Sequence, residues 1–439
     1  MKAYGTWLVS HGLMRAGLSG AAKRGDLIAQ LTVDPALRAD PFAAYEQLRQ
    51  RGEVSHGRLI AATVSHAGVN QVLRNEDFGT ASGRGGLPGP ARRLMERWED
   101  PYSLGPIDPP SLLALDGADH IRLRKMVARA FTARSVQGLE GQVTAVAEKL
   151  LDELAGESSF DLVERYASQL PVAVIADLLG VPDSDRNQVL AWGNEAALLL
   201  DPGLTWAQFR GARRAITSMH HWFQAHIERL RRDPGDDLLS RLAVMDGGLE
   251  DYELRAVGLL VLGAGFETTV SLLSNAVVLL DRHPEQRKLL VAEPERWPNA
   301  VEEVFRFDSP VQLTFREAYA DTQVAGTPIE AGQAMLVVLG AANRDPEVFE
   351  DAQAFHVERP NAHEHVALSA GPHFCLGASL ARLEGTVGLR LLYERFPDLS
   401  VTGTPVRRGT RVLRGYEHVP VSTSARPARR SVPAPSVGR

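Results

Sequence analysis

The stretch Ala370-Gly371-Pro372-His373-Phe374-Cys375-Leu376-Gly377 contains the only cysteine of the chain and stands just ahead of a helical pattern that runs to Arg395. Its glycines let a loop approach a flat ligand closely. The N-terminus of the following helix would stabilise negative charge on the sulfur. An isolated cysteine is more often a small buried hydrophobic residue. The surrounding residues here instead predict a thiolate that binds a ligand.

This loop resembles the haem-binding loop of the cytochrome P450 family, which reads Phe-Gly-x-Gly-x-His/Arg-x-Cys-x-Gly. The matching positions are Gly371, His373, Cys375 and Gly377. The loop departs from the family at Leu368 and Ser369, where Phe and Gly are usual, so a side chain enters its tightest turn. The resemblance implies that Cys375 is the axial thiolate ligand of haem b, iron protoporphyrin IX.

The segment from Val257 to Leu280 is apolar over the ~20 residues that a membrane-spanning helix needs, and Glu267 is its only charged residue. Polar groups at its centre argue against a span and favour a helix buried in a large protein. Acidic residues from Glu250 to Glu253 suit the positive end of a helix dipole, and Asp281-Arg282-His283-Pro284 supplies a stop. The sequence therefore predicts a long helix that crosses the domain.

Within this helix, Ala264-Gly265-Phe266-Glu267-Thr268-Thr269 resembles the oxygen-binding motif of the P450 family, Ala/Gly-Gly-x-Asp/Glu-Thr-Thr. The small residues Ala264 and Gly265 would leave room for O2 beside the haem. A threonine hydroxyl can bond back to the helix backbone and open a groove for water. The resemblance implies that Glu267 and Thr268 are the catalytic pair that delivers protons. The alternative is that these residues form a buried polar turn of the helix with no catalytic role.

Two arginines and a glutamate resemble the Glu-Arg-Arg triad of the family. Glu303 and Arg306 are spaced i, i+3 and so share a helix face, and Arg359 follows later in the chain. Alone, Glu-x-x-Arg is usually a solvated surface pair. Upstream of the cysteine loop, it predicts a structural triad in which one carboxylate holds two guanidinium groups.

A fourth resemblance begins at Asp116, where the chain reads Asp-Gly-Ala-Asp-His-Ile-Arg-Leu-Arg and the family has Asp-Pro-Pro-Glu-His-Thr-Arg-Leu-Arg. Burying two haem propionates requires cationic or hydrogen-bonding partners. The resemblance assigns that role to His120, Arg124, Arg316 and His373. As isolated residues, these would more often be surface groups.

The expected fold is mainly α with a small β-sheet region, the triangular helical prism of the P450 family that encloses haem. The resemblance extends to Leu413–Val421 near the C-terminus. It divides the chain into an N-terminal extension (1–34), the catalytic domain (35–421) and a disordered basic tail (422–439). Periodicity predicts helices at 42–50, 136–154, 171–179, 206–232 and 376–395, and strands at 54–64, 314–320 and 334–339.

Composition excludes several function classes. A net charge of −6 argues against a general nucleic-acid binder. One cysteine cannot form an internal disulfide, a multi-cysteine zinc site or an iron–sulfur cluster. The N-terminus lacks a secretory signal, so we expect a cytoplasmic protein without a transmembrane anchor. An amphipathic helix at the N-terminus that touches a membrane surface stays open as an alternative.

The motifs resemble those of soluble, actinobacterial-type P450 monooxygenases. Such an enzyme activates O2, its co-substrate, with electrons from a ferredoxin and an NAD(P)H-dependent ferredoxin reductase. The short segment after Pro420 leaves no room for a fused reductase. Docking is expected on a basic face formed by Arg122, Lys125, Arg129 and Arg134. The rivals are a peroxygenase that uses peroxide directly and a non-catalytic haem sensor or carrier.

The expected reaction is hydroxylation, with epoxidation as the alternative, of a mainly apolar molecule of polyketide, macrolactone or lipid type from secondary metabolism. The residues assigned to substrate by resemblance are uncharged: Leu262, Gly263, Ala264, Val311, Leu313 and Tyr416. The Gly- and Pro-rich run from Gly79 to Pro110 is expected to form a mobile flap over this site. A small terpene and an aromatic acid anchored by Arg84 are the competing substrates.

Overall fold

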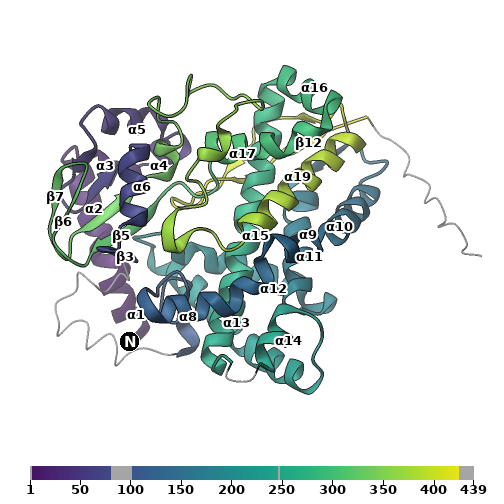
Figure 1. Ribbon diagram of the computed structural model, residues 1–439, viewed down its shortest axis with the longest axis horizontal. Coiled ribbons are helices and arrows are strands. Elements are labelled where there is room, and N and C mark those ends of the chain that lie inside the picture. The colour runs from purple at the N-terminus through teal and green to yellow at the C-terminus, as the bar shows by residue number, and fades with distance from the viewer. Residues whose placement is uncertain (1, 81–100, 246–247, 425–439) are drawn as a thin grey trace, which may run out of the picture.

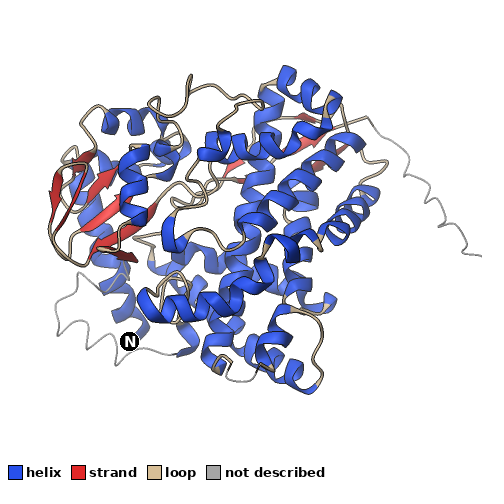
Figure 2. Ribbon diagram, in the orientation of Figure 1, coloured by secondary structure: helices blue, strands red, loops and turns tan. Residues whose placement is uncertain are grey.

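The computed structural model describes residues 2–80, 101–245 and 248–424. Helices make up most of the molecule, and strands gather mainly at one side (Figures 1 and 2). The expected mainly α fold with a small β region is confirmed. The helix predicted at 206–232 forms over those residues, whereas the one predicted at 136–154 is divided by Gly138 and Leu139.

Single 3-10 or π turns extend or connect some of the described α-helices. Along the chain they are α1 Lys2–Trp7, α2 Leu13–Lys23, α3 Leu27–Val33, α4 Pro35–Ala39, α5 Phe42–Arg49, α6 His66–Arg74, α8 Gly117–Val127, α9 Ala133–Gln137, α10 Glu140–Glu153, α11 Gln169–Leu178, α12 Arg186–Ala196, α13 Trp206–Arg232, α14 Leu238–Ala243, α15 Asp251–Arg282, α16 Pro284–Ala292, α17 Trp297–Phe307, α18 Leu339–Ala342 and α19 Ala378–Arg395.

Helix α15 is the central element of the fold. Glu250 and Glu253 form a capping box at its start, and the helix ends at Arg282, just before Pro284 begins α16. It packs against α11, α13, α17 and α19, whose apolar side chains share one large core with it (Figure 1). Among the described residues it alone is long and apolar enough to cross a membrane, and 78% of its most apolar window is buried. The prediction of a buried core helix is confirmed.

The strands are short, and those in the described ranges form four small sheets. They are β1 Val54–His56, β2 Ala61–Thr63, β3 Phe78–Thr80, β4 Ser159–Asp161, β5 Thr314–Ala318, β6 Thr322–Val324, β7 Thr327–Ile329, β8 Ala334–Val337, β9 Ser400–Val401, β10 Val406–Arg407, β11 Tyr416–His418 and β12 Pro420–Ser422. The largest sheet has the order β1-β2-β8-β5-β3, in which only β2 and β8 are parallel. Each of the three predicted strand regions contributes to this sheet.

The first helices of the chain pack against the start of α13 and the segment before it. The Trp7 indole donates a hydrogen bond to the Leu204 carbonyl at 2.9 Å, and its ring lies 5.8 Å from that of Trp206 at the start of α13. At the other end, β12 pairs with β4 and β9. Most of the predicted basic tail, residues 425–439, lies outside the described residues.

Candidate active site

The cysteine loop spans residues 368–377, and backbone hydrogen bonds within it hold its shape. The Cys375 N–H donates to the Leu368 carbonyl at 2.9 Å. Gly371 has φ +66°, and a β-carbon there would lie 2.3 Å from the Leu73 carbonyl oxygen, so only glycine fits. A β-carbon at Gly377 would meet nothing within 4 Å. The loop therefore has open space at Gly377, beside the cysteine.

The environment of Cys375 acts on its thiol in two directions. Burial raises the pKa of the Cys375 thiol, while the Gly377 N–H and the positive charges of Arg124 and Arg382 favour the thiolate. Arg124 also donates to the Phe374 carbonyl at 2.5 Å. These groups would stabilise negative charge on the sulfur, the property that a thiolate ligand to a metal requires.

Ser369 occupies the tight turn that is glycine in the family. Its φ is +63°, in the left-handed region that costs a non-glycine residue about 1–2 kcal/mol. Its hydroxyl oxygen is buried and has no hydrogen-bond partner among the described residues. The side chain is thus tolerated in the turn, without a bond that would compensate for the strain.

One stretch of α15 is open on one side, although the helix is otherwise buried. Ala264 is exposed, and Gly263 and Thr268 are partly exposed. The Thr268 hydroxyl donates to the Ala264 carbonyl at 2.9 Å, as the threonine pattern predicts. Gly265 differs from the expectation, because its β-carbon would lie 2.6 Å from the side chain of Ile175. Gly265 is therefore needed for the packing of α15 on α11, and the free space lies beside Gly263 and Ala264.

Glu267 has a partner that the sequence did not indicate. Its carboxylate is buried on α15, and Arg408 Nη1 lies 2.6 Å from Oε2. Burial raises the pKa of the Glu267 carboxyl, and Arg408 lowers it only in part. The residue can thus hold a proton at a higher pH than an exposed glutamate, next to Thr268. Nothing in the local sequence signals a pairing between residues 141 positions apart.

The four basic residues assigned to the haem propionates lie around the cysteine loop. The rings of His120 and His373 are 4.2 Å apart, and His373 contacts Asp116 Oδ1 at 2.9 Å. Burial lowers the pKa of His120, and together with the neighbouring His373 and Arg124 it brings this pKa to about 4. His120 Nε2 is buried without a hydrogen-bond partner in the described part of the chain. This nitrogen is available to form a hydrogen bond with a bound group that the described chain does not supply.

Asp116 was missed as a site residue in the sequence. Burial alone would raise the pKa of its carboxyl, but hydrogen bonds from His373, Thr80 and Tyr319 outweigh burial and hold the pKa below its usual range. Arg316 is buried nearby, and within the described part of the chain its guanidinium bonds only to Thr314 Oγ1 and the Phe315 carbonyl. It therefore keeps donors for a further anionic group.

The predicted triad residues lie together in the core. Glu303 and Arg306 are fully buried, with Arg306 Nε 2.6 Å from Glu303 Oε2, and Arg359 Nε is 3.2 Å from the same oxygen. Arg306 also donates to the carbonyls of Asn343, Ala352 and Ala354. The Glu303 carboxylate thus fixes α17 to the segment that leads towards the cysteine loop.

The residues assigned to substrate do not all border open space. Leu262 and Tyr416 are only 1% and 2% exposed and belong to the main core, so neither side chain borders open space in the described structure. Leu262 precedes Ala264 by about 200° of helix rotation, so it points away from the open side. The Arg407 guanidinium covers the Tyr416 ring at 3.9 Å. The other assigned residues remain accessible: Ala264 is exposed, and partial exposure is found at Gly263, Val311 and Leu313.

An apolar cavity of about 430 Å³ lies between the segment 101–111, α13 and α15. Its walls include Leu104, Pro106, Pro110, Ala256 and Leu259. This segment is the described end of the predicted flap, so part of that run does border a ligand-sized space. Residues 81–100, with the candidate anchor Arg84, lie outside the described residues.

Comparison with known proteins agrees with this geometry. The family model for cytochrome P450 matches residues 91–407. The cytochrome P450 140 of Mycobacterium tuberculosis is 46% identical over 97% of this chain and 98% of its own length. The 6-deoxyerythronolide B hydroxylase of Saccharopolyspora erythraea is 39% identical over 73% of this chain and 77% of its own length.

A solved structure, the ligand-free CYP164A2 of Mycobacterium smegmatis, matches with a TM-score of 0.81 at 34% identity and covers 90% of this chain and 99% of that chain. The chain belongs to the cytochrome P450 family and is a monooxygenase. The family binds haem through a cysteine thiolate. The residues present fit this group, since the sole cysteine lies in a loop with free space and the buried His120 has an unused nitrogen.

Glu384 on α19 is a buried acid with no charged partner in the part of the chain that the structure describes, and it gives a testable pH dependence. Burial raises the pKa of its carboxyl to about 8, and the Thr269 hydroxyl lowers it only in part. Between pH 4.5 and 8 the unfolded chain loses this proton while the folded protein keeps it, so stability falls as pH rises. We expect Glu384→Gln to flatten this fall and to stabilise the protein at pH 8 by about 2–4 kcal/mol.

Denaturant unfolding at several pH values measures this effect. Glu394→Gln changes an acid on the surface of the same helix and is the matched control. Its free energy of unfolding should depend on pH as that of wild type does. Equal pH slopes for Glu384→Gln and wild type would contradict the assignment of a protonated Glu384 in the folded protein.

Proposed function

We propose that the protein hydroxylates, or epoxidises, a mainly apolar organic substrate with electrons from a separate ferredoxin and an NAD(P)H-dependent ferredoxin reductase. The observation that carries this proposal is the pair Glu267 and Thr268 beside the open stretch of α15. A buried acid next to a hydroxyl at such a space is a proton-delivery arrangement. A peroxygenase or a haem carrier would not need this pair.

Cys375 would hold haem b through its thiolate, with Gly371 and Gly377 shaping the loop. Its propionates would bond to His120, Arg124, Arg316 and His373, and Ala264 would face its other side. When bound, the haem supplies the reduction and activation of O2. The remaining work is done by the chain: Glu267 takes up protons near Arg408 and passes them to Thr268 Oγ1, which donates them into the space beside Ala264.

The apolar cavity beside α15 supports a substrate with a large apolar body, because its lining is dominated by proline and aliphatic side chains. The relative named 6-deoxyerythronolide B hydroxylase supports a polyketide, macrolactone or lipid substrate from secondary metabolism. The proposed ferredoxin and its NAD(P)H-dependent reductase imply that this protein works in the cytoplasm.

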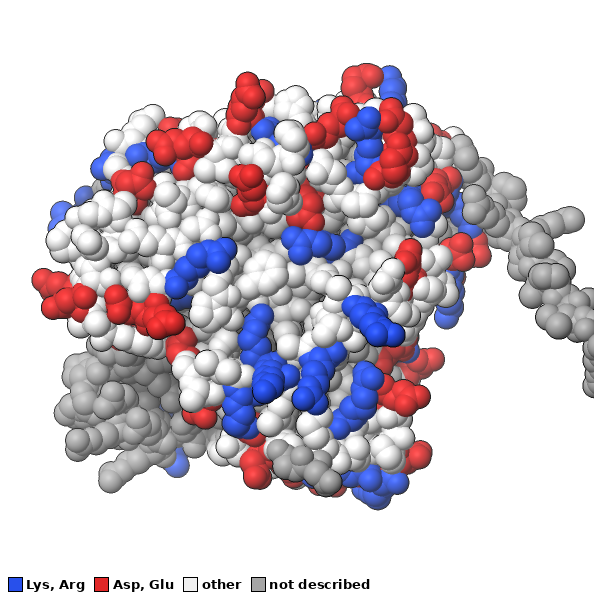
Figure 3. Space-filling model, viewed as in Figure 1, with Lys and Arg blue, Asp and Glu red and all other residues white. Residues whose placement is uncertain are grey.

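A basic face around the cysteine loop supports docking of an acidic ferredoxin. Lys125, Arg129 and Arg134 are exposed on α8, α9 and the turn between them, and Figure 3 shows basic side chains gathered on this face. Arg122 is also there, but it forms an ion pair with Glu253, so it contributes less. Exposed Ile121 and Phe374 give the same region apolar contact surface. Basic charge steers the encounter, and apolar side chains hold the complex.

The electron source distinguishes the proposal from its rivals. We expect product from the haem-loaded enzyme with ferredoxin, reductase, NADPH and O2, and none with NADPH alone. The rate at limiting ferredoxin should fall as salt rises, because steering is screened. Equal turnover with hydrogen peroxide would favour a peroxygenase, and no product despite substrate binding would favour a carrier.

Thr268→Ala tests the proton-delivery role directly. Haem content and substrate affinity should stay close to wild type, since among the described residues the side chain bonds only to its own helix. Product formed per NADPH consumed should fall by roughly tenfold or more, with the electrons recovered as hydrogen peroxide. Thr268→Ser keeps the hydroxyl and is the matched control. Unchanged coupling in Thr268→Ala would remove this residue from the mechanism.

A further inference from the structure

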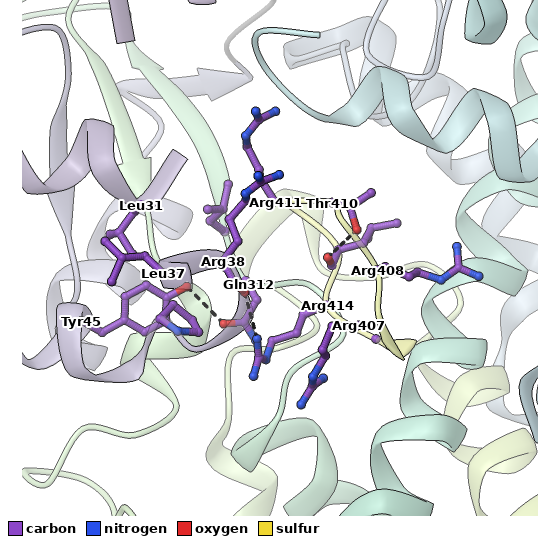
Figure 4. Close-up of a pocket in the computed structure, with 14 residues that line it drawn as sticks. Leu31, Leu37, Arg38, Tyr45, Gln312, Arg407, Arg408, Thr410, Arg411 and Arg414 are labelled. Carbon is purple, nitrogen blue, oxygen red and sulfur yellow. Dashed lines mark hydrogen bonds between the residues drawn. The ribbon is translucent and has the colours of Figure 1, made fainter. Parts of the chain in front are cut away.

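A second pocket is lined by five arginines and lies between the N-terminal helices and the loop that joins β10 to β11 (Figure 4). Its volume is about 30 Å³, enough for one small polar group. The arginines are Arg38, Arg407, Arg408, Arg411 and Arg414. No carboxylate is among the described residues that line this pocket. The rest of its wall includes four leucines and the polar side chains of Tyr45, Gln312 and Thr410.

Three of the five arginines are paired with acids behind the pocket wall. Asp308 binds both Arg407 at 2.8 Å and Arg414 at 2.6 Å. Arg408 extends away from the pocket, towards Glu267 on α15 (Figure 4). These three side chains therefore act mainly as structural ties between the C-terminal loop and the core.

Arg38 and Arg411 are not balanced in this way. Asp201 is the acid near them, but its carboxylate accepts the backbone N–H groups of Arg411 and Val412 and lies 3.9 Å from the Arg411 guanidinium. Burial lowers the pKa of Arg411, as do the charges of Arg38 and Arg15. Two cations, Arg38 and Arg411, thus act on one carboxylate, and Arg411 also donates to the carbonyls of Thr32 and Pro202.

Arg38 has an unused donor in the pocket. Its Nη1 donates to the Gly409 carbonyl at 2.8 Å, whereas its Nε is buried and bonds to nothing in the described part of the chain. A buried cationic donor without a partner is costly. An anion bound between Arg38 and Arg411 would remove this cost.

We propose that this pocket binds the carboxylate of an otherwise apolar organic acid, which is the substrate. The inference rests on the proposed monooxygenase function and narrows its substrate class. Arginine pairs with carboxylates through two parallel hydrogen bonds, and the leucines beside Arg38 suit an apolar chain. The pocket also adjoins the strand segment that contains Val311 and Leu313, since Val311 pairs with Leu413.

Binding of dodecanoate to the haem-loaded protein tests the proposal by calorimetry, which needs neither turnover nor a haem signal. Wild type should bind dodecanoate roughly 10- to 100-fold more tightly than 1-dodecanol, the strength of hydrogen bonds to a charged group. Arg38→Gln should weaken dodecanoate binding by a similar factor and leave 1-dodecanol unchanged. Arg51→Gln removes an exposed arginine elsewhere and should bind both ligands as wild type does.

Equal affinity of wild type for dodecanoate and 1-dodecanol would overturn the proposal, and so would an unaffected Arg38→Gln. Acetate that raises the thermal midpoint as much as dodecanoate would identify a site for free anions and overturn the substrate assignment. Tight dodecanoate binding without any product in the ferredoxin assay would leave the pocket in place and contradict the proposed function alone.

Discussion

Cys375→Ser is expected to abolish the red-shifted absorption of the reduced, carbon monoxide-bound haem protein, because only thiolate ligation produces that band. The loss should be complete, since no other cysteine exists in the chain to replace it. Serine is close to cysteine in size, so the loop from Leu368 to Gly377 should keep its backbone bonds. Absorption spectra of the variant and of wild type at equal haem concentration measure the effect.

Cys375→His is the companion variant, because a neutral imidazole can still ligate iron. It should retain haem and yet lack the thiolate band, which separates loss of the ligand type from loss of the cofactor. Circular dichroism checks that both variants fold. A variant that keeps the red-shifted band would contradict the assignment of Cys375 as the ligand.

The long helix could be predicted almost to the residue, because its signals are local. Acidic residues cap its start, a charged stretch ending in proline stops it, and the run between them is mostly apolar. The residues of β1 and β2 were predicted as a single strand region, whereas in the structure they form a hairpin. Its residues show β pattern, but the turn between them lacks a strong signal.

The electrostatic partners of the site could not be predicted, because they come from distant segments. Arg408 reaches Glu267 from the loop after β10, and Asp116 meets His373 from the start of α8. Each contact depends on how helices and the small sheets pack, and no spacing rule encodes it. The arginine pocket has the same origin, since Arg38 and Arg411 meet only in the folded chain.

Resemblance placed residues on the correct element more reliably than on the correct side of it. Leu262 and Gly265 flank the open stretch of α15, yet one lies in the core and the other packs on Ile175. A helix turns by about 100° per residue, so an offset of one or two positions moves a side chain from a cavity into the core. Residue-level assignment of substrate contacts therefore needs the packed structure.

Glu303→Ala is expected to yield little folded, haem-loaded protein. It would leave two buried guanidinium groups, Arg306 and Arg359, without their shared carboxylate. Breaking a buried pair in this way costs about 3–5 kcal/mol, a large part of the ~5–15 kcal/mol that stabilises a typical protein. Haem content per protein and the thermal midpoint measure the loss.

The variants of the triad should rank in a definite order. Arg306→Ala removes the donors to three carbonyls but leaves Glu303 paired with Arg359, so it should destabilise the protein less than Glu303→Ala. Glu285→Ala is the matched control, because Glu285 pairs with Lys288 at the same i, i+3 spacing on an exposed helix face, and it should change little. Near-normal haem content in Glu303→Ala, or equal loss in Glu285→Ala, would show that the buried carboxylate is not what holds α17 to the segment before the cysteine loop.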